Sequence, residues 1–300
     1  MTNLGMITIL ARRRVARARV FAAASRLGCA AAVATLAAGC ATPTQNTDQF
    51  AGEWHFQRDV ESGNDFRHVV YRNNAPVRGA VLHVYIDGDG TPYWQRNLSA
   101  TDPTPRDPVM LRLMALDPDR SVYIGRPCYF GLYRDPPCTA AYWTTRRYAP
   151  EVVESLEAVL RAETARAGAL HVELFGHSGG GTLAVLLAQR VGSVTRVVTL
   201  GANLDISAWC KLHGYSPLAG SLNPVDEHAL RTGVQVLHLV GDRDNNTPPS
   251  LVDSAARARG GEPVRVMAGF DHSCCWETVW RSILREPLEL TGRDPSDNVI

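Results

Sequence analysis

One short run of residues has the types and spacing of a serine nucleophile. The run Gly176-His177-Ser178-Gly179-Gly180 follows the pattern G-x-S-x-G. It comes after the apolar segment 170–175 and before a helix-like segment, so Ser178 is expected at a sharp strand-to-helix turn. Glycines relieve the crowding at such a turn, and the N-terminus of the following helix presents free N–H groups to a developing oxyanion. A glycine-rich turn without chemistry is the alternative interpretation.

Apolar runs of strand length alternate with helix-like segments along the chain. Several runs are apolar on both faces, as parallel strands covered by helices on both sides should be. Three segments are predicted helices: Pro150–Ala167, Gly180–Val191 and Trp276–Leu284. This alternation predicts an α/β domain with a doubly wound, mostly parallel sheet flanked by helices. The predicted strands are Phe66–Tyr71, Val81–Ile86, Ser121–Ile124, Leu170–Phe175, Val194–Leu200, Val234–Val240 and Pro263–Met267.

Together these features resemble the α/β-hydrolase superfamily from about Val81 to Trp280. More narrowly, the chain is similar to a group of functionally uncharacterised bacterial α/β-hydrolase-like lipoproteins. The elbow at Gly176–Gly181 carries the superfamily likeness. The resemblance implies a Ser-His-Asp triad in the chain order Ser, Asp, His, with no cofactor, and the subgroup implies no substrate. The likeness to the subgroup rests on the segments Tyr85–Gly90, Asp102–Arg106, Gly125–Cys128 and Ser216–Pro224.

A serine hydroxyl is a weak nucleophile at neutral pH, so it needs a base, and the base needs an orienting acid. The turn Gly241–Pro248 resembles the G-x-x-D…P turn of the superfamily, and this match selects Asp244 as the acid. Asp242, as a residue that caps the turn, and Asp205, after the preceding strand, remain alternatives. His272 is expected to be the base, because it lies between the last strand and the last helix, where the superfamily places its histidine.

The other histidines have weaker support as the base. His177 is too close to Ser178 in sequence, and His83 and His238 lie within strands, where a core position is the usual role. The run Asp271–Cys275 matches no usual zinc spacing, so no metal site is expected there.

The oxyanion hole is expected to use backbone N–H groups from two turns. Gly179 follows the nucleophile, and the turn 85–90 resembles the H-G-x-G segment of the superfamily, with Asp87 in place of the histidine. This register makes the N–H of Asp89 the second donor, provided that its carboxylate points away from the oxyanion. A tight glycine turn stiffened by two aspartate side chains is the structural alternative.

Three long connections, 87–120, 126–149 and 201–232, are expected to form the walls of a pocket at the C-terminal edge of the sheet. Arg126 lies in one of them, where a structural salt bridge is favoured over a contact with a substrate carboxylate. The aromatic side chains of these connections either line an acyl pocket or pack beneath the loops. They are Trp94, Tyr129, Phe130, Tyr133, Tyr142, Trp143 and Trp209.

The N-terminal segment has the pattern of a bacterial export signal. Six arginines precede the apolar run 27–38, which is too short for a comfortable membrane span. The run Leu36-Ala37-Ala38-Gly39-Cys40 resembles a lipobox, so residues 1–39 are predicted to be a lipoprotein signal peptide and Cys40 to be lipidated. An ordinary cleaved signal is the alternative. Residues 40–49 are expected to be a lipidated tether, and 50–300 a single α/β-hydrolase domain.

Charge and cysteine content restrict the partners and the compartment. The formal net charge of +1 includes the six N-terminal arginines, and without them 25 basic and 30 acidic residues remain. Nucleic-acid binding is therefore not expected. In an oxidising compartment the cysteines should pair, with Cys128 and Cys138 closing a local loop and Cys210 joining Cys274 or Cys275. The absence of aspartate after Cys40 suggests the outer membrane, facing the periplasm.

These expectations combine into one function and one rival. The chain is expected to be a serine hydrolase that acts on a carboxylic ester or related acyl substrate through an acyl-enzyme, held at the membrane by a lipid on Cys40. Thioesterase and peptidase activities use the same triad. The rival is a catalytically silent envelope lipoprotein that uses the fold for binding or assembly.

Overall fold

The computed structural model describes residues 41–76, 80–95 and 98–287. The predicted signal peptide over 1–39 and the lipidation site Cys40 lie outside these ranges. Within the described ranges, no helix combines the length and the apolar character needed to cross a membrane.

The core of the domain is an eight-stranded sheet with the order β1-β2-β6-β3-β7-β8-β9-β10. Strands β6, β3, β7, β8, β9 and β10 run parallel to one another, whereas β2 pairs antiparallel with both β6 and the edge strand β1. A separate ladder joins β4 and β5. The strands are β1 (Gln57–Ser62), β2 (Arg67–Arg72), β3 (Val81–Ile86), β4 (Tyr93–Gln95), β5 (Leu98–Ser99), β6 (Ser121–Ile124), β7 (His171–His177), β8 (Val194–Leu200), β9 (Gln235–Gly241) and β10 (Val264–Met267).

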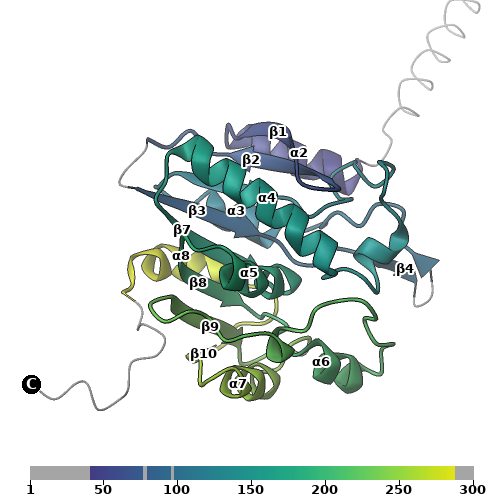
Figure 1. The fold of residues 1–300 in the computed structure, drawn as a ribbon, viewed down its shortest axis with the longest axis vertical. Coiled ribbons are helices and arrows are strands. Elements are labelled where there is room, and N and C mark those ends of the chain that lie inside the picture. The colour runs from purple at the N-terminus through teal and green to yellow at the C-terminus, as the bar shows by residue number, and fades with distance from the viewer. Residues whose placement is uncertain (1–40, 77–79, 96–97, 288–300) are drawn as a thin grey trace, which may run out of the picture. The chain divides into compact units, whose positions relative to one another are not determined.

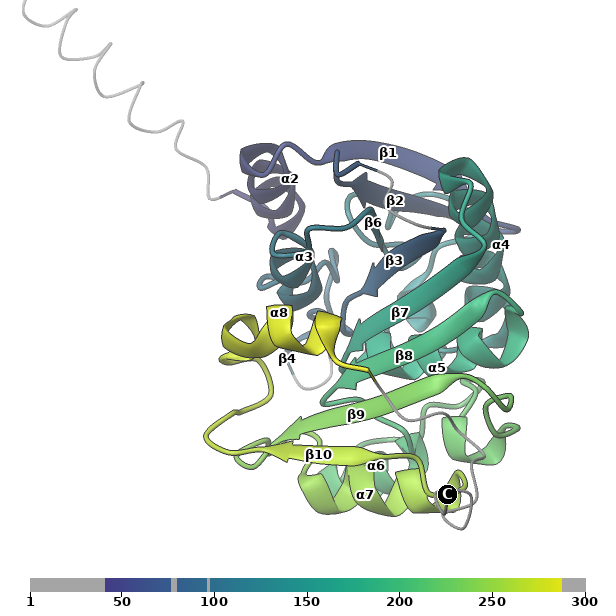
Figure 2. The same ribbon diagram turned by 90° about the vertical axis from the view of Figure 1, so that its left-hand side faces the viewer.

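Helices cover both faces of this sheet, as Figures 1 and 2 show. The first face carries α4 (Pro150–Ala167), α5 (Gly179–Arg190), α6 (Ile206–His213) and α7 (Pro249–Ala258), and the second carries α2 (Pro43–Glu53), α3 (Val109–Met114) and α8 (Trp276–Arg285). Two short 3-10 helices lie at Ala140–Trp143 and Pro224–Asp226. The predicted doubly wound, mostly parallel α/β architecture is confirmed.

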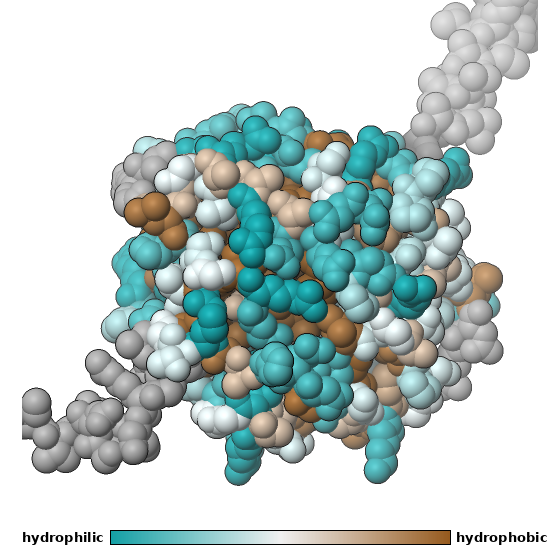
Figure 3. Space-filling view, in the orientation of Figure 1, coloured by the Kyte–Doolittle hydropathy of each residue, from teal (hydrophilic) through white to brown (hydrophobic). Residues whose placement is uncertain are grey.

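The side chains of each central strand pack into two separate hydrophobic layers, one on each face of the sheet. In β3, Leu82, Val84 and Ile86 pack with α4 and α5, while Tyr85 points into the layer under α3 and α8. Side chains alternate between the faces of a strand, so a strand covered on both sides must be apolar at nearly every position. This is why the parallel strands are recognisable as continuous apolar runs. The face in Figure 3 is mainly hydrophilic over α4, as expected of the outer side of an amphipathic helix.

Strand β1 was not predicted, because its sequence has no apolar face. Its residues Gln57–Ser62 are mostly exposed or half-buried, and the strand is held by a six-residue antiparallel register with β2. Arg72 of β2 forms ion pairs with Asp59 and Glu61, the latter at 2.5 Å. Pairing with β2, rather than hydrophobic periodicity, therefore places this edge strand.

The segment expected to be a polar tether forms a helix from Pro43 onward. Thr47 and Ala51, one turn apart on α2, are buried against the body of the domain. Asp48 accepts hydrogen bonds from the Tyr71 hydroxyl at 2.5 Å and from Arg58 Nε at 2.9 Å. Residues 43–49, which were expected to be part of a tether, are therefore part of a helix. A local hydrophobicity pattern does not reveal such polar contacts.

The cysteine pairing is partly as predicted. Cys128 and Cys138 form the expected disulfide. The predicted pairing of Cys210 is wrong: Cys274 bonds to Cys275, and Cys210 is buried and unpaired. The reason is topological. Cys210 lies on α6, whose Ile206 packs on the first face of the sheet, whereas Cys275 precedes α8 on the second.

Candidate active site

Ser178 stands at a tight turn between β7 and α5. Its backbone adopts φ 52° and ψ −124°, a conformation that residues other than glycine rarely adopt. The Ser178 N–H donates to Leu200 O at 2.8 Å, which ties the turn to the neighbouring strand. A Cβ atom on Gly176 would overlap the backbone of Gly180, and one on Gly180 would overlap Ile86 O. Both glycines are therefore required by close backbone approach.

Asp244 and His272 come together across two neighbouring strand ends. His272 Nδ1 lies 2.7 Å from Asp244 Oδ2, and the Asp244 side chain has no exposure. The carboxylate also accepts from the N–H groups of Asn246 and Thr247, both at 2.8 Å, and from the Thr247 hydroxyl at 3.0 Å. Burial acts to raise the pKa of Asp244, but the hydrogen bonds from His272 and Thr247 outweigh it and lower the pKa, so the carboxylate stays ionised at neutral pH.

The far nitrogen of His272 is engaged by an asparagine. Because Asp244 accepts from Nδ1, Nε2 carries the lone pair, and Asn246 Nδ2 lies 3.0 Å from it. Among the hydrogen bonds of the described residues, none joins His272 to Ser178 Oγ. Ser178, Asn246 and His272 nevertheless line one cavity of about 870 Å³. In this arrangement Asn246, and not Ser178, contacts Nε2 of the imidazole.

His177 supports the histidine loop rather than competing with His272. Its Nε2 donates to the backbone oxygen of His272 at 2.8 Å, and the two imidazole rings lie 4.8 Å apart. The other carboxylates proposed from the sequence have structural partners: Asp205 accepts from Ser207 N and Ala208 N at the start of α6, and Asp242 accepts from Gly269 N.

The turn after β3 packs directly against the elbow. A Cβ on Gly88 would lie 3.1 Å from Ser178 Cβ, and one on Gly179 would overlap the Asp89 carboxylate. Asp87 accepts from Gly88 N at 3.0 Å and from Met110 N at 3.2 Å, so it stiffens the turn as the structural alternative anticipated. The two backbone N–H groups expected to bind an oxyanion, those of Gly179 and Asp89, therefore belong to segments in contact.

The Asp89 carboxylate contacts two arginines and a tyrosine. It accepts from Arg147 Nη1 at 2.7 Å and from the Tyr148 hydroxyl at 2.8 and 2.9 Å, and it pairs with Arg126. Burial acts to raise the pKa of Asp89, but the charges of Arg147 and Arg126 hold it far below its ordinary range. Arg126 is thus a structural partner, which confirms the interpretation favoured from the sequence.

Most of the aromatic residues considered for an acyl pocket pack in the core instead. Tyr129, Phe130 and Trp143 are buried beneath the loops. Trp209 does line the cavity, together with Tyr93 and Tyr215, which the sequence analysis did not single out. Asn246 and Arg147 were also not predicted as site residues. Their contacts with His272 and Asp89 depend on the three-dimensional arrangement, and no sequence motif marks them.

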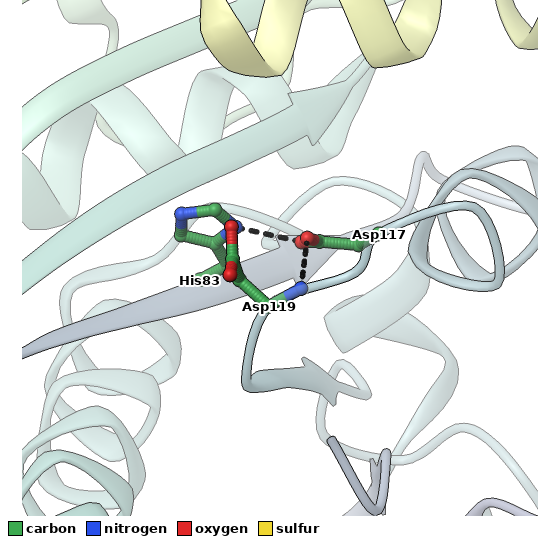
Figure 4. A group of neighbouring side chains, drawn as sticks. All are labelled: His83, Asp117 and Asp119. Atoms are coloured by element: carbon green, nitrogen blue, oxygen red, sulfur yellow. Dashed lines mark hydrogen bonds and ion pairs between the residues drawn. The ribbon is translucent and has the colours of Figure 1, made fainter. Parts of the chain in front are cut away.

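A separate cluster, His83, Asp117 and Asp119, brings its ligand-type atoms within 4.8 Å of one another (Figure 4). Both carboxylate oxygens of Asp117 already have partners. Asp117 Oδ2 accepts from His83 Nδ1 at 2.7 Å and from the Tyr85 hydroxyl at 2.6 Å, and Oδ1 accepts from Asp119 N at 2.9 Å. The cluster is therefore explained by a buried ion pair and a turn, without a metal.

Comparison with known proteins identifies the fold. No family model matches the chain, and no curated protein matches it in sequence. Among solved structures, a bacterial membrane phospholipase A matches with a TM-score of 0.56 and 14% identity, over 90% of this chain and 100% of its own. An esterase of Pyrococcus furiosus matches with a TM-score of 0.54 and 9% identity, over 82% of this chain and 92% of its own.

A third structure, an α/β serine hydrolase without a lid from Xanthomonas campestris, matches with a TM-score of 0.50 and 12% identity, over 80% of this chain and 97% of its own. These likenesses establish the α/β-hydrolase fold of the chain. The structural neighbours are serine hydrolases.

Proposed function

We propose that this protein is a serine hydrolase that cleaves a carboxylic ester through an acyl-enzyme intermediate, with Ser178 as nucleophile, His272 as base and Asp244 as orienting acid. The observation that carries the proposal is the 2.7 Å contact between the buried Asp244 carboxylate and His272, which lines the same cavity as Ser178. In a neutral imidazole, a carboxylate that accepts from Nδ1 favours the tautomer whose Nε2 carries the lone pair, which is the form that a general base needs.

The proposed reaction has two acyl-transfer steps. Ser178 Oγ attacks the ester carbonyl as His272 Nε2 takes its proton, and the oxyanion is held by the N–H groups of Gly179 and Asp89. Collapse of this intermediate breaks the bond to the alcohol, which leaves with the proton from His272. Water then attacks the acyl-enzyme with His272 again as base, and the acid is released as Ser178 regains its proton. No cofactor enters the scheme.

The choice of an ester rests on the chemistry of the site and on analogy. Two of the structural neighbours are described as a phospholipase and an esterase, and others as peptidases, which use the same type of triad. The described groups are sufficient for attack on an ester. The side chains of the cavity walls would decide whether thioester and amide substrates are also accepted.

A fluorophosphonate probe tests the nucleophile directly. The parent protein should be labelled covalently, and Ser178→Ala should not. Asp244→Asn should reduce labelling and turnover of 4-nitrophenyl esters by about 10³-fold or more, because it removes the orienting charge. Asp205→Asn is the matched control, since Asp205 caps α6, and it should label normally. Equal labelling of Ser178→Ala and the parent would contradict the assignment.

One observation favours a second candidate, a catalytically silent binding protein. His272 Nε2 is engaged by Asn246 rather than by Ser178. Under this alternative the parent protein, folded and at neutral pH, would show no labelling above that of Ser178→Ala.

We further propose that Cys40 carries the lipid anchor of an envelope lipoprotein, in the outer membrane facing the periplasm. The support is the small-residue run before Cys40 and the short apolar segment preceding it. Cys40→Ser should leave the protein uncleaved or released from lipid anchoring, and metabolic labelling with an alkyne fatty acid should mark the parent but not the variant. Equal fatty-acid labelling of both would reject the anchor.

A further inference from the structure

Two buried guanidinium groups share a single carboxylate beside the cavity. Asp89 pairs with Arg126 through one oxygen and with Arg147 through the other, the latter at 2.7 Å. Arg126 is 2% exposed and Arg147 is 4% exposed, so both charges have been removed from bulk water. The tyrosines that border them, Tyr129 and Tyr148, are neutral at physiological pH, because burial raises the pKa of Tyr129 to about 12 and that of Tyr148 further. The group Asp89–Arg126–Arg147 therefore holds one positive charge in excess.

Arg147, and not Arg126, presents this excess charge to the cavity. Arg126 lies between the rings of Tyr129 and Tyr148, 5.3 Å from each ring centre, and donates to Arg147 O at 2.7 Å. Arg147 is part of the cavity lining, together with Ser178 and His272. Two of its three guanidinium nitrogens are used: Nε donates to Thr144 O at 2.6 Å and Nη1 donates to Asp89.

The third nitrogen of Arg147 is left for a ligand. Nη2 has no hydrogen-bond partner among the described residues, and it is not one of the fully buried atoms that lack a partner, so it keeps some exposure on a residue that lines the cavity. A buried cation that is not balanced by an anion is costly, and arginine is well suited to bind carboxylate or phosphate oxygens. The same guanidinium is anchored at two points, so little side-chain entropy is lost when an anion binds.

Apart from Asp89, no acidic residue of the cavity forms an ion pair with Arg147 in the part of the chain that the structure describes. Asp107 pairs with Arg112, and Asp87 is bound to two backbone N–H groups, with His177 Nδ1 3.6 Å away. Arg106, at the exposed rim, adds a second positive charge, and its guanidinium lies over the Trp94 ring at 5.4 Å.

We propose that Arg147 forms an anion subsite within the cavity, so that the substrate is an ester bearing a carboxylate or phosphate group close to the bond that Ser178 attacks. This inference rests on the proposed function. Arg147 then determines specificity: it favours acyl chains or alcohols that carry an oxyanion over neutral ones of the same length. Arg106 contributes only to attraction at the rim, since it is exposed and screened by solvent.

Matched substrate pairs test the subsite in the parent protein. The first pair is the 4-nitrophenyl monoester of glutaric acid and its methyl-capped neutral counterpart, and the second is 4-nitrophenyl 4-phosphonobutanoate and its dimethyl phosphonate. A kcat/KM at least tenfold higher for the charged member of one pair supports the proposal, and the preferred pair distinguishes carboxylate from phosphate. Equal values within both pairs, or a preference for the neutral members, would overturn it.

Variants assign the preference to one side chain. Arg147→Gln should bring the ratio of charged to neutral substrate close to one, Arg147→Lys should keep part of the preference, and Arg106→Gln should keep most of it. A ratio is insensitive to a uniform loss of active protein. If Arg147→Gln retains the full preference, the subsite is assigned wrongly. If that variant does not fold, the assignment to Arg147 is judged from the charged-to-neutral substrate ratios of the parent and of Arg147→Lys.

A binding measurement separates this inference from the proposed function. Inorganic phosphate or succinate is added to Ser178→Ala, and the midpoint of thermal unfolding is recorded with and without Arg147→Gln. A rise of the midpoint that requires Arg147 supports the subsite even if no ester is cleaved, in which case only the hydrolase proposal fails. Hydrolysis of neutral esters with no Arg147-dependent rise and no charge preference would leave the hydrolase and reject the subsite.

Discussion

At the scale of single residues, Asn246 contacts the nitrogen of His272 that the proposed triad would offer to the serine hydroxyl. Its side-chain amide lies 3.0 Å from His272 Nε2 and its backbone N–H donates to Asp244 at 2.8 Å, so one residue contacts both proposed partners of Ser178. Under the proposed mechanism, the imidazole must exchange Asn246 for Ser178. The side-chain contact therefore favours the resting arrangement.

Removal of this contact should increase turnover. A neutral hydrogen bond contributes about 1 kcal/mol, so Asn246→Ala is expected to raise kcat/KM for a small neutral ester by roughly fivefold. The neighbouring exposed residue provides the control: Asn245→Ala should have no effect. A fall in kcat/KM for Asn246→Ala alone would show that the amide orients His272 instead of competing with Ser178.

At the scale of elements, the loop between β6 and α4 is stabilised by a covalent link. Cys128 and Cys138 are ten positions apart in the sequence, and Tyr129 and Phe130, which lie between them, are buried in the core. The adjacent pair Cys274–Cys275 closes a ring with no residue between them. Loop closure should therefore contribute to stability in the first case and hardly at all in the second.

Denaturant unfolding can measure this difference. The double variant Cys128→Ser, Cys138→Ser should lose about 2–3 kcal/mol of unfolding free energy, because the unfolded chain regains the conformations that the link excludes. The matched double variant Cys274→Ser, Cys275→Ser should change it by less than about 1 kcal/mol. Equal losses in both variants would be inconsistent with loop entropy as the cause.

The elements also show which parts of the fold are readable from sequence. Seven sheet strands and the helices over 150–167, 179–190 and 276–285 were predicted nearly to the residue, because all of them except β10 bury a continuous apolar run or stripe. Strand β1 and helix α2 were not, since polar pairing with β2 and hydrogen bonds from Tyr71 and Arg58 hold them. Helices α3 and α6 were hidden within segments interpreted as long connections.

The same distinction applies to the site. The positions of Ser178, Asp244 and His272 follow from a motif and from chain order, and the structure brings the last two into contact. The role of the Asp89 carboxylate did not follow, because its partners Arg126 and Arg147 come from a distant connection. The interaction of Asn246 with His272 depends on side-chain orientation, which no residue pattern encodes.

At the scale of the whole molecule, a buried histidine whose pKa is raised links stability to pH. His83 in β3 contacts Asp117 at 2.7 Å and Glu173 at 3.6 Å. Burial acts to lower the pKa of His83, but the hydrogen bond to Asp117 and the charges of Asp117, Glu173 and Asp119 outweigh it, so the pKa is raised. A raised folded pKa means that the stabilisation is complete below the unfolded value of about 6.5 and is lost as pH rises through the folded value.

His83→Gln isolates this contribution, since glutamine keeps a hydrogen-bond donor for Asp117 without the charge. The variant should be less stable than the parent at pH 6, and the gap in unfolding free energy should narrow by pH 9. Urea unfolding of both proteins at the two pH values measures the difference. A gap that is constant with pH, or wider at pH 9, would contradict the assignment.

The construction of the elbow has a consequence for how such a protein diversifies. The floor beneath Ser178 is made of main chain pressed against main chain, at Gly176, Gly180 and Ile86 O, so almost any side chain added there is excluded. The surrounding walls are loop side chains such as Tyr93, Trp209 and Tyr215. The side chains of the walls can thus change over evolutionary time, and the proposed substrate preference with them, while the floor keeps the elbow unchanged.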